Sequence, residues 1–274
     1  MGSTGISTAQ TMIGKIAVVS GSSRGIGAAI ALELSSRGAS IVLNYPYPDL
    51  QAECDSVGAQ LKTDWISACA DLSTVDGPAD LIRQAVERFG HIDILVNNAG
   101  WVPLAPLWES DVETWDKAMS LNARGAFLLT KAALPHLTPY TPSNRLDAAG
   151  ATNGSRIIIV GSAASRTPRE NQGIYAATKG ALDSMLRVWA KELPPKYGCT
   201  VNAVGPGPVL TDAFRQNLGE HFDEVLEAAS RETPVEGAFA AVEDVAWTVA
   251  FLAEERSRFI NGAFMLLSGG RYMQ

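Results

Sequence analysis

The stretch IAVVSGSSRGIG, residues 16–27, decides the fold. It begins with four apolar residues, passes through a glycine-rich turn and ends where apolar spacing predicts a helix over residues 25–37. Gly21 permits the tight turn, Gly25 lets the backbone approach a phosphate, and Gly27 allows close packing of helix on strand. Because a helix start presents free N–H groups to an anion, the stretch predicts dinucleotide binding. The alternative is a glycine-rich turn that only links strand to helix.

The same alternation of strand and helix continues along the chain. Short β-branched runs predict buried parallel strands, and longer apolar patterns predict helices. The expected strands are residues 16–19, 40–43, 65–70, 92–96, 156–160, 199–204 and 262–267, and the expected helices are 25–37, 74–89, 112–136, 174–192 and 242–253. This order predicts an α/β fold with a doubly wound, mostly parallel sheet of about seven strands and helices on both faces, the Rossmann fold.

One domain is expected to account for nearly all of the 274 residues, since no repeat or shift of composition marks a boundary. Residues 1–13 are expected to be a flexible leader, and residues 14–274 a single dinucleotide-binding domain. The polar residues 138–155, rich in proline and glycine, predict an exposed and mobile insertion.

The composition argues against several classes of partner. The net charge is −7 and lysine and arginine form no cluster, so nucleic acid is not an expected partner. No apolar stretch is long enough to span a bilayer, which argues against a membrane partner. Cys54, Cys69 and Cys199 are too widely spaced for a disulfide framework or a metal cluster. Together with three scattered histidines, they predict a cytoplasmic protein without a bound metal.

A phenol and an ammonium group lie four residues apart in YAATK, residues 175–179. This spacing puts Tyr175 and Lys179 on one face of a helix. A nearby ammonium favours the phenolate, so we expect the pKa of Tyr175 to lie below its usual value of about 10. Taken alone, such a pair is more often a solvated helix pair.

These motifs together resemble the short-chain dehydrogenase/reductase family, whose fingerprint is T-G-x-x-x-G-x-G. Ser20 stands where threonine is usual and keeps the hydroxyl group. The resemblance runs from about Gly14 to Gly270 and includes Asp71, Asn97-Asn98-Ala99-Gly100, Asn122, Ser162, Tyr175, Lys179 and Pro206-Gly207. The chain departs from the family at Ser268, which replaces an aspartate before two glycines. We expect this change to affect the C-terminal packing.

The resemblance implies an oxidoreductase with four catalytic residues. Tyr175 is implied as the proton donor, and Lys179 as the cation that assists it and reaches the nicotinamide ribose. Ser162 is implied to bind the substrate carbonyl oxygen, and Asn122 to help hold a water in a proton relay towards Lys179. Ser162 follows a strand at the edge where open α/β sheets bind ligands, which agrees with this role.

The resemblance also implies where the cofactor binds. Asp71 would meet the adenine amino group, unless it only caps a helix. Asn98 would contact the cofactor, unless it only stabilises a strand-end turn. Val209 and Thr211 would meet the nicotinamide carboxamide. The full set of implied cofactor residues is Gly21, Ser23, Arg24, Gly25, Ile26, Gly27, Asn44, Tyr45, Asp71, Leu72, Asn98, Ala99, Gly100, Tyr175, Lys179, Pro206, Gly207, Val209 and Thr211.

Three of these residues favour NADP(H) over NAD(H). An NAD-specific site usually has a carboxylate after the second strand, whereas this chain has the neutral Asn44, followed by the hydroxyl donor of Tyr45. In the glycine turn, Arg24 could bond a ribose phosphate bidentately. The pattern resembles fungal-type trihydroxynaphthalene and polyketide ketoreductases, which prefer NADPH. Asp49 keeps NAD(H) open as the alternative, since its loop could fold the carboxylate towards the ribose.

Apolar residues near the expected nicotinamide site predict a hydrophobic or aromatic substrate. The expected substrate residues are Trp101, Ser162, Pro168 and Phe214, with Val102, Leu104 and Leu218 as further candidates. For Trp101, plain packing is the alternative. Arg166 and Arg169 keep open an anionic group on the substrate. Residues 207–237 are expected to include a lid over the substrate.

These residues predict an NADP(H)-dependent ketoreductase or alcohol dehydrogenase, which transfers a hydride between nicotinamide and a small-molecule carbonyl or secondary alcohol. One alternative is a family member that uses the same site for dehydration, epimerisation or ring formation. Another is a non-catalytic nicotinamide-binding regulator. The helices expected at 112–136 and 174–192 have broad apolar faces, which favours a homo-oligomer, either a tetramer or a dimer.

Overall fold

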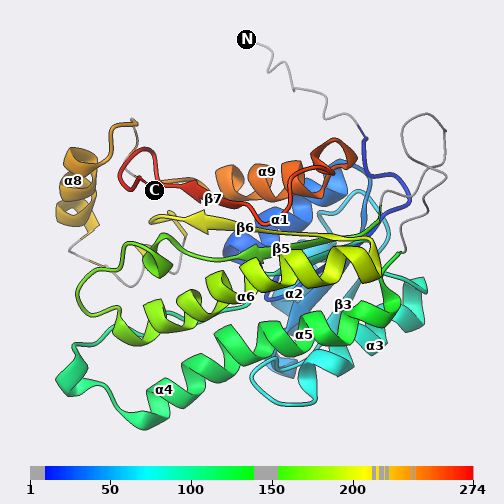
Figure 1. The fold of residues 1–274 in the computed structure, drawn as a ribbon, viewed down its shortest axis with the longest axis horizontal. Coiled ribbons are helices and arrows are strands. Elements are labelled where there is room, and N and C mark those ends of the chain that lie inside the picture. The colour runs from blue at the N-terminus through cyan, green and yellow to red at the C-terminus, as the bar shows by residue number, and fades with distance from the viewer. Residues whose placement is uncertain are drawn as a thin grey trace.

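A parallel sheet forms the centre of the protein (Figure 1). The computed structural model describes residues 10–138, 154–211, 214–215, 219, 222–235, 237 and 239–273. Within them the strands are β1 (Ile16–Val19), β2 (Ser40–Tyr45), β3 (Trp65–Cys69), β4 (Ile94–Asn97), β5 (Arg156–Val160), β6 (Thr200–Pro206) and β7 (Phe264–Leu267). They form a parallel sheet in the order β3-β2-β1-β4-β5-β6-β7. The order reverses between β1 and β4, and open α/β sheets bind ligands at such a switch point.

Helices cover both faces of the sheet (Figure 1). The α-helices are α1 (Gly25–Ser36), α2 (Gln51–Gly58), α3 (Gly77–Phe89), α4 (Val112–Ala118), α5 (Ala126–Ala133), α6 (Gly173–Tyr197), α8 (Phe222–Glu232) and α9 (Val242–Ala253). A π-helical segment, η3 (Met119–Gly125), joins α4 to α5. The short 3-10 turns are η1 (Pro48–Leu50), η2 (Leu107–Glu109), η4 (Leu134–His136), η6 (Ala163–Ser165) and η8 (Glu255–Ser257).

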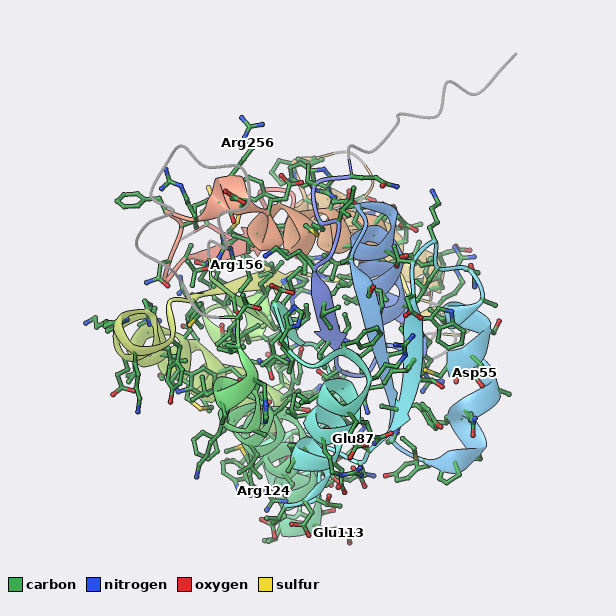
Figure 2. All side chains as sticks on the ribbon, turned by 90° about the vertical axis from the view of Figure 1, so that its right-hand side faces the viewer. Asp55, Glu87, Glu113, Arg124, Arg156 and Arg256 are labelled. Atoms are coloured by element: carbon green, nitrogen blue, oxygen red, sulfur yellow. The ribbon has the colours of Figure 1, made fainter. Side chains whose placement is uncertain are left out.

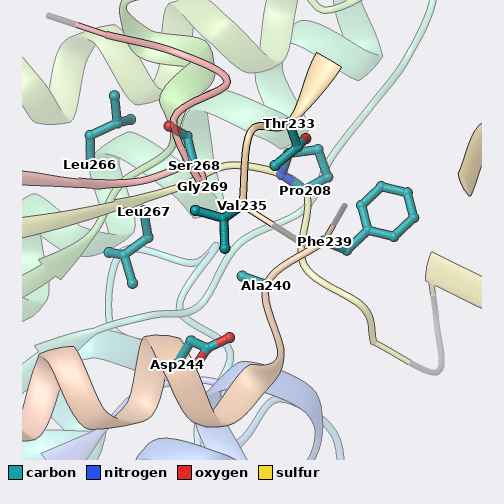
Figure 3. Close-up of a pocket in the computed structure, with 10 residues that line it drawn as sticks. All are labelled: Pro208, Thr233, Val235, Phe239, Ala240, Asp244, Leu266, Leu267, Ser268 and Gly269. Atoms are coloured by element: carbon teal, nitrogen blue, oxygen red, sulfur yellow. The ribbon is translucent and has the colours of Figure 1, made fainter. Parts of the chain in front are cut away.

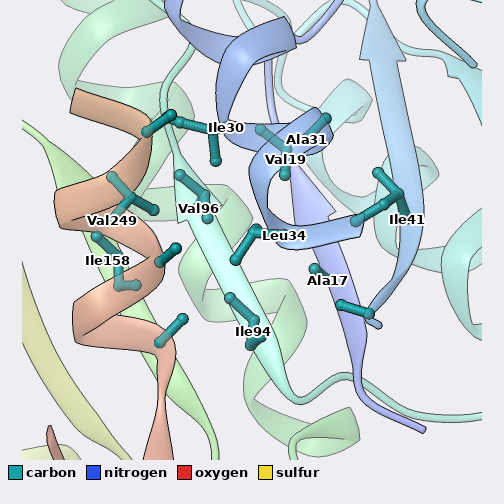
Figure 4. Close-up of a cluster of buried hydrophobic side chains, with 14 of the residues drawn as sticks. Ala17, Val19, Ile30, Ala31, Leu34, Ile41, Ile94, Val96, Ile158 and Val249 are labelled. Atoms are coloured by element: carbon teal, nitrogen blue, oxygen red, sulfur yellow. The ribbon is translucent and has the colours of Figure 1, made fainter. Parts of the chain in front are cut away.

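Successive residues of the central strands face two separate cores, because side chains alternate along a strand. Ala17 and Val19 of β1 face the core under α1 and α9 (Figure 4). Leu34 of α1 and Val249 of α9 close that core. Val18 faces the other core, under α3, α5 and α6. Since both faces of the sheet are covered, the strands appear in the sequence as continuous apolar runs.

Two arginines, one exposed at the surface and one buried at the start of a strand, illustrate how differently charged residues are placed. Figure 2 shows Arg256 projecting away from the domain and Arg156 lying inside it, where 3% of Arg156 is exposed. Arg156 begins β5 and donates to the carbonyl oxygens of Gly154 and Ser155 at 3.2 and 3.3 Å. It therefore lies at the amino-terminal edge of the sheet, away from the edge where ligands bind.

The predicted fold class is confirmed, whereas several helix boundaries differ from the prediction. Helix α2 was not expected, because only three of its residues are buried and its apolar periodicity is too short to detect. The single helix expected over residues 112–136 is interrupted by η3 and ends in a 3-10 turn. Helix α6 continues through Pro194 and Pro195 to Tyr197 and is capped by Gly198, whose φ of +65° is the left-handed conformation that ends helices.

The folded part of the chain starts earlier than predicted. Met12, in the expected leader, is 2% exposed, and its N–H donates to the Arg37 carbonyl at 2.8 Å. Residues 1–9 of that leader and residues 139–153 of the expected insertion lie outside the described residues. Within the described part, no helix is both long and apolar enough to cross a membrane.

The close approach of α1 to the glycine turn gives a first test. A Cβ at Gly27 would lie 2.3 Å from the Gly21 carbonyl oxygen and 2.5 Å from Asn98 Nδ2. We therefore expect Gly27→Ala to lower the free energy of unfolding by about 2 kcal/mol, as overpacked sites do. Gly180→Ala in α6 is the control, because a Cβ there meets no described atom within 4 Å. Equal stability of the two variants in urea titration would contradict the tight packing at Gly27.

Candidate active site

Ser162 lies at the carboxyl end of β5, where the sheet opens towards a ligand. Its Oγ accepts a hydrogen bond from the Ala164 N–H at 3.1 Å, because Ser162 caps the turn η6. This contact uses a lone pair of the oxygen and leaves the hydroxyl hydrogen to be donated elsewhere. The Ser162 hydroxyl also lies close enough to Tyr175 to act on the pKa of its phenol. Ser162 is thus fixed by its turn and able to donate.

Tyr175 and Lys179 lie on successive turns of α6, beside Ser162. Lys179 Nζ is 5.9 Å from the centre of the Tyr175 ring and donates to the Val160 carbonyl at 2.9 Å. A Cβ at Gly100 would lie 3.6 Å from Lys179 Nζ, so the turn after β4 closes on the same place. The structure therefore brings the ends of β4 and β5 and the start of α6 to one point.

Burial controls the acid–base groups of this site. It lowers the pKa of Lys179 from 10.5 to about 8, since a low-dielectric surrounding disfavours the ammonium ion. Burial also raises the pKa of Tyr175, and the nearby Ser162 hydroxyl opposes this rise without reversing it. The expectation that Lys179 lowers the pKa of Tyr175 is therefore wrong for the protein's own groups. Desolvation of the phenolate is the largest cause of its raised pKa, and the Lys179 nitrogen is bonded to the Val160 carbonyl.

Asn122 connects the loop after β4 to α6. It is fully buried, and its Oδ1 accepts from the Trp101 N–H at 2.8 Å. Its Nδ2 donates to the Trp101 carbonyl at 2.8 Å and to Thr178 Oγ1 at 3.0 Å. Thr178 in turn donates to the Tyr175 carbonyl at 2.7 Å. Asn122 lies in the π-helical segment η3, and such segments occur often at functional sites.

Thr178 was not among the predicted residues, because a threonine inside a Tyr-x-x-x-Lys helix turn gives no signal of its own.

The side-chain amide of Asn122 is bonded to the protein through both its oxygen and its nitrogen. Both amide hydrogens are donated, so a water held by Asn122 would donate to Oδ1, which has a second lone pair, or bind to the backbone.

The glycine turn has room and donors for a phosphate. Gly25 has a φ of +57°, and a Cβ there would meet only Thr211 Cγ2, at 3.8 Å. No side chain caps the start of α1, and its first turn holds no acidic residue. Free N–H groups beside open space are what a dinucleotide pyrophosphate needs, so these residues fit the cofactor. Asn98 Nδ2 donates to the carbonyls of Ser20 and Gly21 and thereby stabilises the turn.

Asn44 and Tyr45 were predicted to meet the adenosine ribose phosphate. In the structure, Asn44 is hydrogen-bonded to backbone groups and Tyr45 is packed against core residues. Asn44 is 2% exposed; its Oδ1 accepts from the Gly21 N–H, and its Nδ2 donates to backbone carbonyls of β2 and of the end of β3. Tyr45 is packed in the core beside α2, and burial raises the pKa of its phenol. Arg24 is the exposed member of the three, with Glu53 4.0 Å away.

Asp71, predicted to meet adenine, lies just past the end of β3. Its Oδ1 accepts from the N–H of Ser73 at 2.9 Å and from the Ser73 hydroxyl at 2.7 Å. The charge of the Asp71 carboxylate raises the pKa of the nearby Tyr47 phenol. Tyr47 was missed by the sequence analysis, since a tyrosine in an exposed loop follows no period. Asp49, in the turn η1, is exposed.

Further predicted cofactor residues lie along β6 and the segment after it. Pro206 ends β6, and the Gly207 N–H donates to β7 at 2.7 Å. An isolated β-bridge pairs Val209 with Ala240, which joins this segment to the chain that leads into α9. Leu72 differs from these residues, because it is packed in the core.

A cavity of about 180 Å³ adjoins the catalytic groups. It is lined by Trp101, Pro103, Leu104, Ala105, Ser110, Thr114, Asn171 and Ile174. Ile174 precedes Tyr175, and Lys117 Nζ lies 4.6 Å from the centre of the Trp101 ring. Pro168 is not in this lining, and Phe214 packs edge-on against Phe239 at 5.4 Å. Leu218 lies outside the described residues.

None of the catalytic groups is among the residues that line a larger cavity, of about 300 Å³ (Figure 3). It is lined by Pro208, Thr233, Val235, Phe239, Ala240, Asp244, Leu266, Leu267, Ser268 and Gly269. Neither Ser162 nor Tyr175 is among these lining residues. We therefore place the site by its converging polar groups and not by cavity size, since chemistry requires those groups.

Known proteins are similar to this chain in sequence. A family model described as enoyl-(acyl carrier protein) reductase matches residues 21–271. The chain is 37% identical over 270 residues to the short-chain dehydrogenase/reductase FrzI of a Cladobotryum species. This alignment covers 95% of this chain and 96% of that protein. It is 33% identical over 278 residues to a hydroxynaphthalene reductase-like protein of Metarhizium anisopliae. That alignment covers 96% of this chain and 97% of the relative.

Solved structures share the fold. A short-chain dehydrogenase from Burkholderia cenocepacia, in complex with NADP, superposes with a TM-score of 0.81 and 32% identity over 95% of this chain and 99% of that one. A dehydrogenase/reductase from Sinorhizobium meliloti superposes with a TM-score of 0.80 and 32% sequence identity. The match covers 97% of this chain and 98% of that one. Fold and site thus define an oxidoreductase that uses a nicotinamide cofactor. The chain belongs to the short-chain dehydrogenase/reductase family.

The buried ammonium of Lys179 predicts a particular dependence of stability on pH. Its pKa of about 8 in the fold lies below the ordinary 10.5, so between these values the unfolded state binds more protons. Wild-type stability should therefore rise with pH in that window. We expect the unfolding free energy of wild type minus that of Lys179→Met to increase by about 3 kcal/mol from pH 7 to 10.5. The exposed Lys191→Met is the control, and a flat difference for Lys179→Met would refute the prediction.

Proposed function

We propose that this chain is an NADP(H)-dependent ketoreductase or alcohol dehydrogenase, which transfers a hydride between nicotinamide and a carbonyl or secondary alcohol. The observation that supports this most is the convergence of Ser162, at the end of β5, with Tyr175 and the buried Lys179 of α6. Polar groups that are buried despite their desolvation cost and that converge on one point are typical of active sites.

The proposed roles follow from the positions of these groups. Tyr175 donates its phenolic proton to the substrate oxygen in reduction, and its raised pKa keeps that proton on the phenol near neutral pH. Ser162 donates its hydroxyl hydrogen to the same oxygen. The Lys179 ammonium adds positive charge close to the oxygen on which negative charge develops. Asn122 joins the loop that holds Trp101 to the helix that holds Thr178 through its amide hydrogen bonds.

The glycine turn and α1 would hold the cofactor phosphates, and Lys179 would reach the nicotinamide ribose. When bound, the cofactor supplies the hydride. Two observations support NADP(H) over NAD(H). Arg24 is exposed beside the turn, and its pairing with Glu53 at 4.0 Å is weak enough to be given up for a phosphate. The neighbouring structure from Burkholderia cenocepacia is a complex with NADP.

The proposed substrate is a hydrophobic or aromatic carbonyl compound. The cavity beside Tyr175 supports this, because Trp101, Leu104 and Ile174 line it with apolar surface. The name of the Metarhizium relative, a hydroxynaphthalene reductase-like protein, agrees with an aromatic substrate.

A homo-oligomer, dimer or tetramer, is also proposed. Val112 and Trp115 of α4, Phe127 of α5 and Val188 of α6 are exposed apolar residues on the helices expected to pair. A cytoplasmic location stays a prediction; all three cysteines are free thiols.

Replacing the proton donor tests the mechanism. We expect Tyr175→Phe to lower turnover of carbonyl compounds by about 10² to 10⁴, since the variant has no hydroxyl proton to transfer. Cofactor affinity, measured by fluorescence titration, should stay close to that of wild type. Tyr197→Phe, at the far end of α6, is the matched control. Undiminished turnover by Tyr175→Phe would end the proposed mechanism.

Replacing Arg24 tests the cofactor preference. We expect Arg24→Ala to weaken NADPH binding by roughly 1.5–3 kcal/mol more than NADH binding, the usual range for a hydrogen bond to a charged group. Arg256→Ala removes the same charge from an exposed place and should leave both affinities unchanged. An equal loss for both cofactors, or tighter binding of NADH by the wild type, would contradict the assignment.

A further inference from the structure

Four side chains join the C-terminus, α8 and the loop before Tyr175. Arg169 Nη2 and Arg271 Nη2 both donate to Oε2 of Glu232, the first at 2.9 Å. Arg169 Nε donates to the Tyr272 hydroxyl at 2.7 Å. The central carbon of each guanidinium lies 5.7 Å from the centre of the Tyr272 ring. We name Arg169, Glu232, Arg271 and Tyr272 the arginine cluster.

A tight C-terminal turn holds two members of the cluster. Ser268 Oγ accepts from the Tyr272 N–H at 3.2 Å and donates to the Tyr272 carbonyl at 2.9 Å. The Gly269 carbonyl accepts from the Val235 N–H at 3.0 Å, which ties this turn to the chain that follows α8. Ser268 therefore shapes this turn through both of its hydrogen bonds to Tyr272.

Arg271 is buried more deeply than an ordinary surface ion pair. Its side chain is 4% exposed, against 57% for Glu232. Its Nε and Nη1 are buried and have no hydrogen-bond partner in the part of the chain that the structure describes. Buried donors without partners are rare in native proteins, because they lose their hydration without compensation. Arg271 therefore has binding capacity that the fold itself does not use.

Glu232 occupies the position that an anionic ligand would take. Its carboxylate lies against both guanidinium groups, which hold its pKa below the ordinary value. The cluster has two positive charges and one negative, in a protein whose net charge is −7. Because the Glu232 side chain is more than half exposed, it can rotate into water at little cost. Both arginines would then be available to another carboxylate, and such charge-assisted bonds are strong.

The cluster lies at the substrate end of the molecule. Arg169 belongs to the segment that links Ser162 to Tyr175, and its N–H donates to Oε1 of Gln172, the N-cap of α6. Figure 1 shows α8, the C-terminus and the start of α6 at the same end of the molecule as the tips of β6 and β7.

Arg166, the other arginine considered for an anionic group, is already committed to the protein. Its Nε and Nη2 donate to the two carboxylate oxygens of Asp183 at 3.1 and 2.9 Å. Its guanidinium also lies over the Phe264 ring at 4.1 Å. The structure thus favours Arg169 over Arg166 as an anion-binding residue.

We propose that Arg169 and Arg271 form a subsite for a carboxylate or similar acidic group of the substrate, and that Glu232 is an internal competitor for it. The inference rests on the proposed carbonyl reduction at Tyr175 and narrows its substrate class. The substrate has an apolar or aromatic body, a carbonyl group that reaches Tyr175, and an acidic group at its other end. The Tyr272 ring offers that body a flat surface beside both guanidinium groups.

The test compares 4-acetylbenzoate with its methyl ester, which has no charge. Dissociation constants are measured calorimetrically on the full chain with NADP⁺ present, so that no reduction occurs. We expect Glu232→Gln to bind the acid about tenfold more tightly than wild type, since the competing carboxylate is removed, and the ester with unchanged affinity. Adding Arg271→Met, or Arg169→Met if that variant does not fold, should abolish the gain. Glu227→Gln, earlier on α8, is the control and should change neither constant.

The subsite is overturned if Glu232→Gln binds the acid no more tightly than wild type, or if acid and ester gain equally. It is also overturned if the gain in affinity for the acid survives the added arginine substitution, whether that is Arg271→Met or Arg169→Met. Reduction of the ester by wild type with NADPH reports separately on the proposed function. If Glu232→Gln shows the expected gain for the acid and neither compound is reduced, the subsite stands and the proposed reduction fails.

Discussion

The buried amide of Asn122 is the contact on which the site depends. It bonds to both backbone groups of Trp101 and to the hydroxyl of Thr178, so the loop after β4 and the helix α6 cannot move independently. A buried amide left without these partners would cost about 1–3 kcal/mol for each lost bond. The same contacts bring Gly100 against Lys179. The catalytic groups are thus placed by a polar network in the core and not by a surface loop.

Burial acts on Tyr175 and Lys179 in opposite directions. It raises the pKa of the phenol and lowers that of the ammonium, because each neutral form is favoured in a low dielectric. As pH rises, Lys179 therefore loses its proton before Tyr175 does. In the protein alone, the phenol is a proton donor over the whole neutral range. That order of titration agrees with a site prepared to protonate a carbonyl oxygen.

The protein separates a rigid scaffold from a variable binding region. The sheet edge and α6 hold the catalytic groups through backbone pairing and buried hydrogen bonds. The arginine cluster depends on α8 and on the C-terminal turn, segments that lie outside the sheet. Function is commonly varied on such peripheral segments, because they change without disturbing the core. Substrate choice in this chain would then rest on contacts between Arg169, close to Tyr175 in the sequence, and residues of α8 and the C-terminal turn that are remote from it.

The sequence by itself determined the features that depend on neighbouring residues. The apolar periods indicated the strands and most helices, the glycine spacing indicated the turn before α1, and the four-residue interval placed Tyr175 and Lys179 on one helix face. Only the tertiary structure decided features that depend on distant contacts. Asn44 proved to be bonded to backbone, and Arg169 meets Glu232 across 63 residues of chain. The pKa of Tyr175 rises because of burial, and burial is set by packing, which no local pattern of residues encodes.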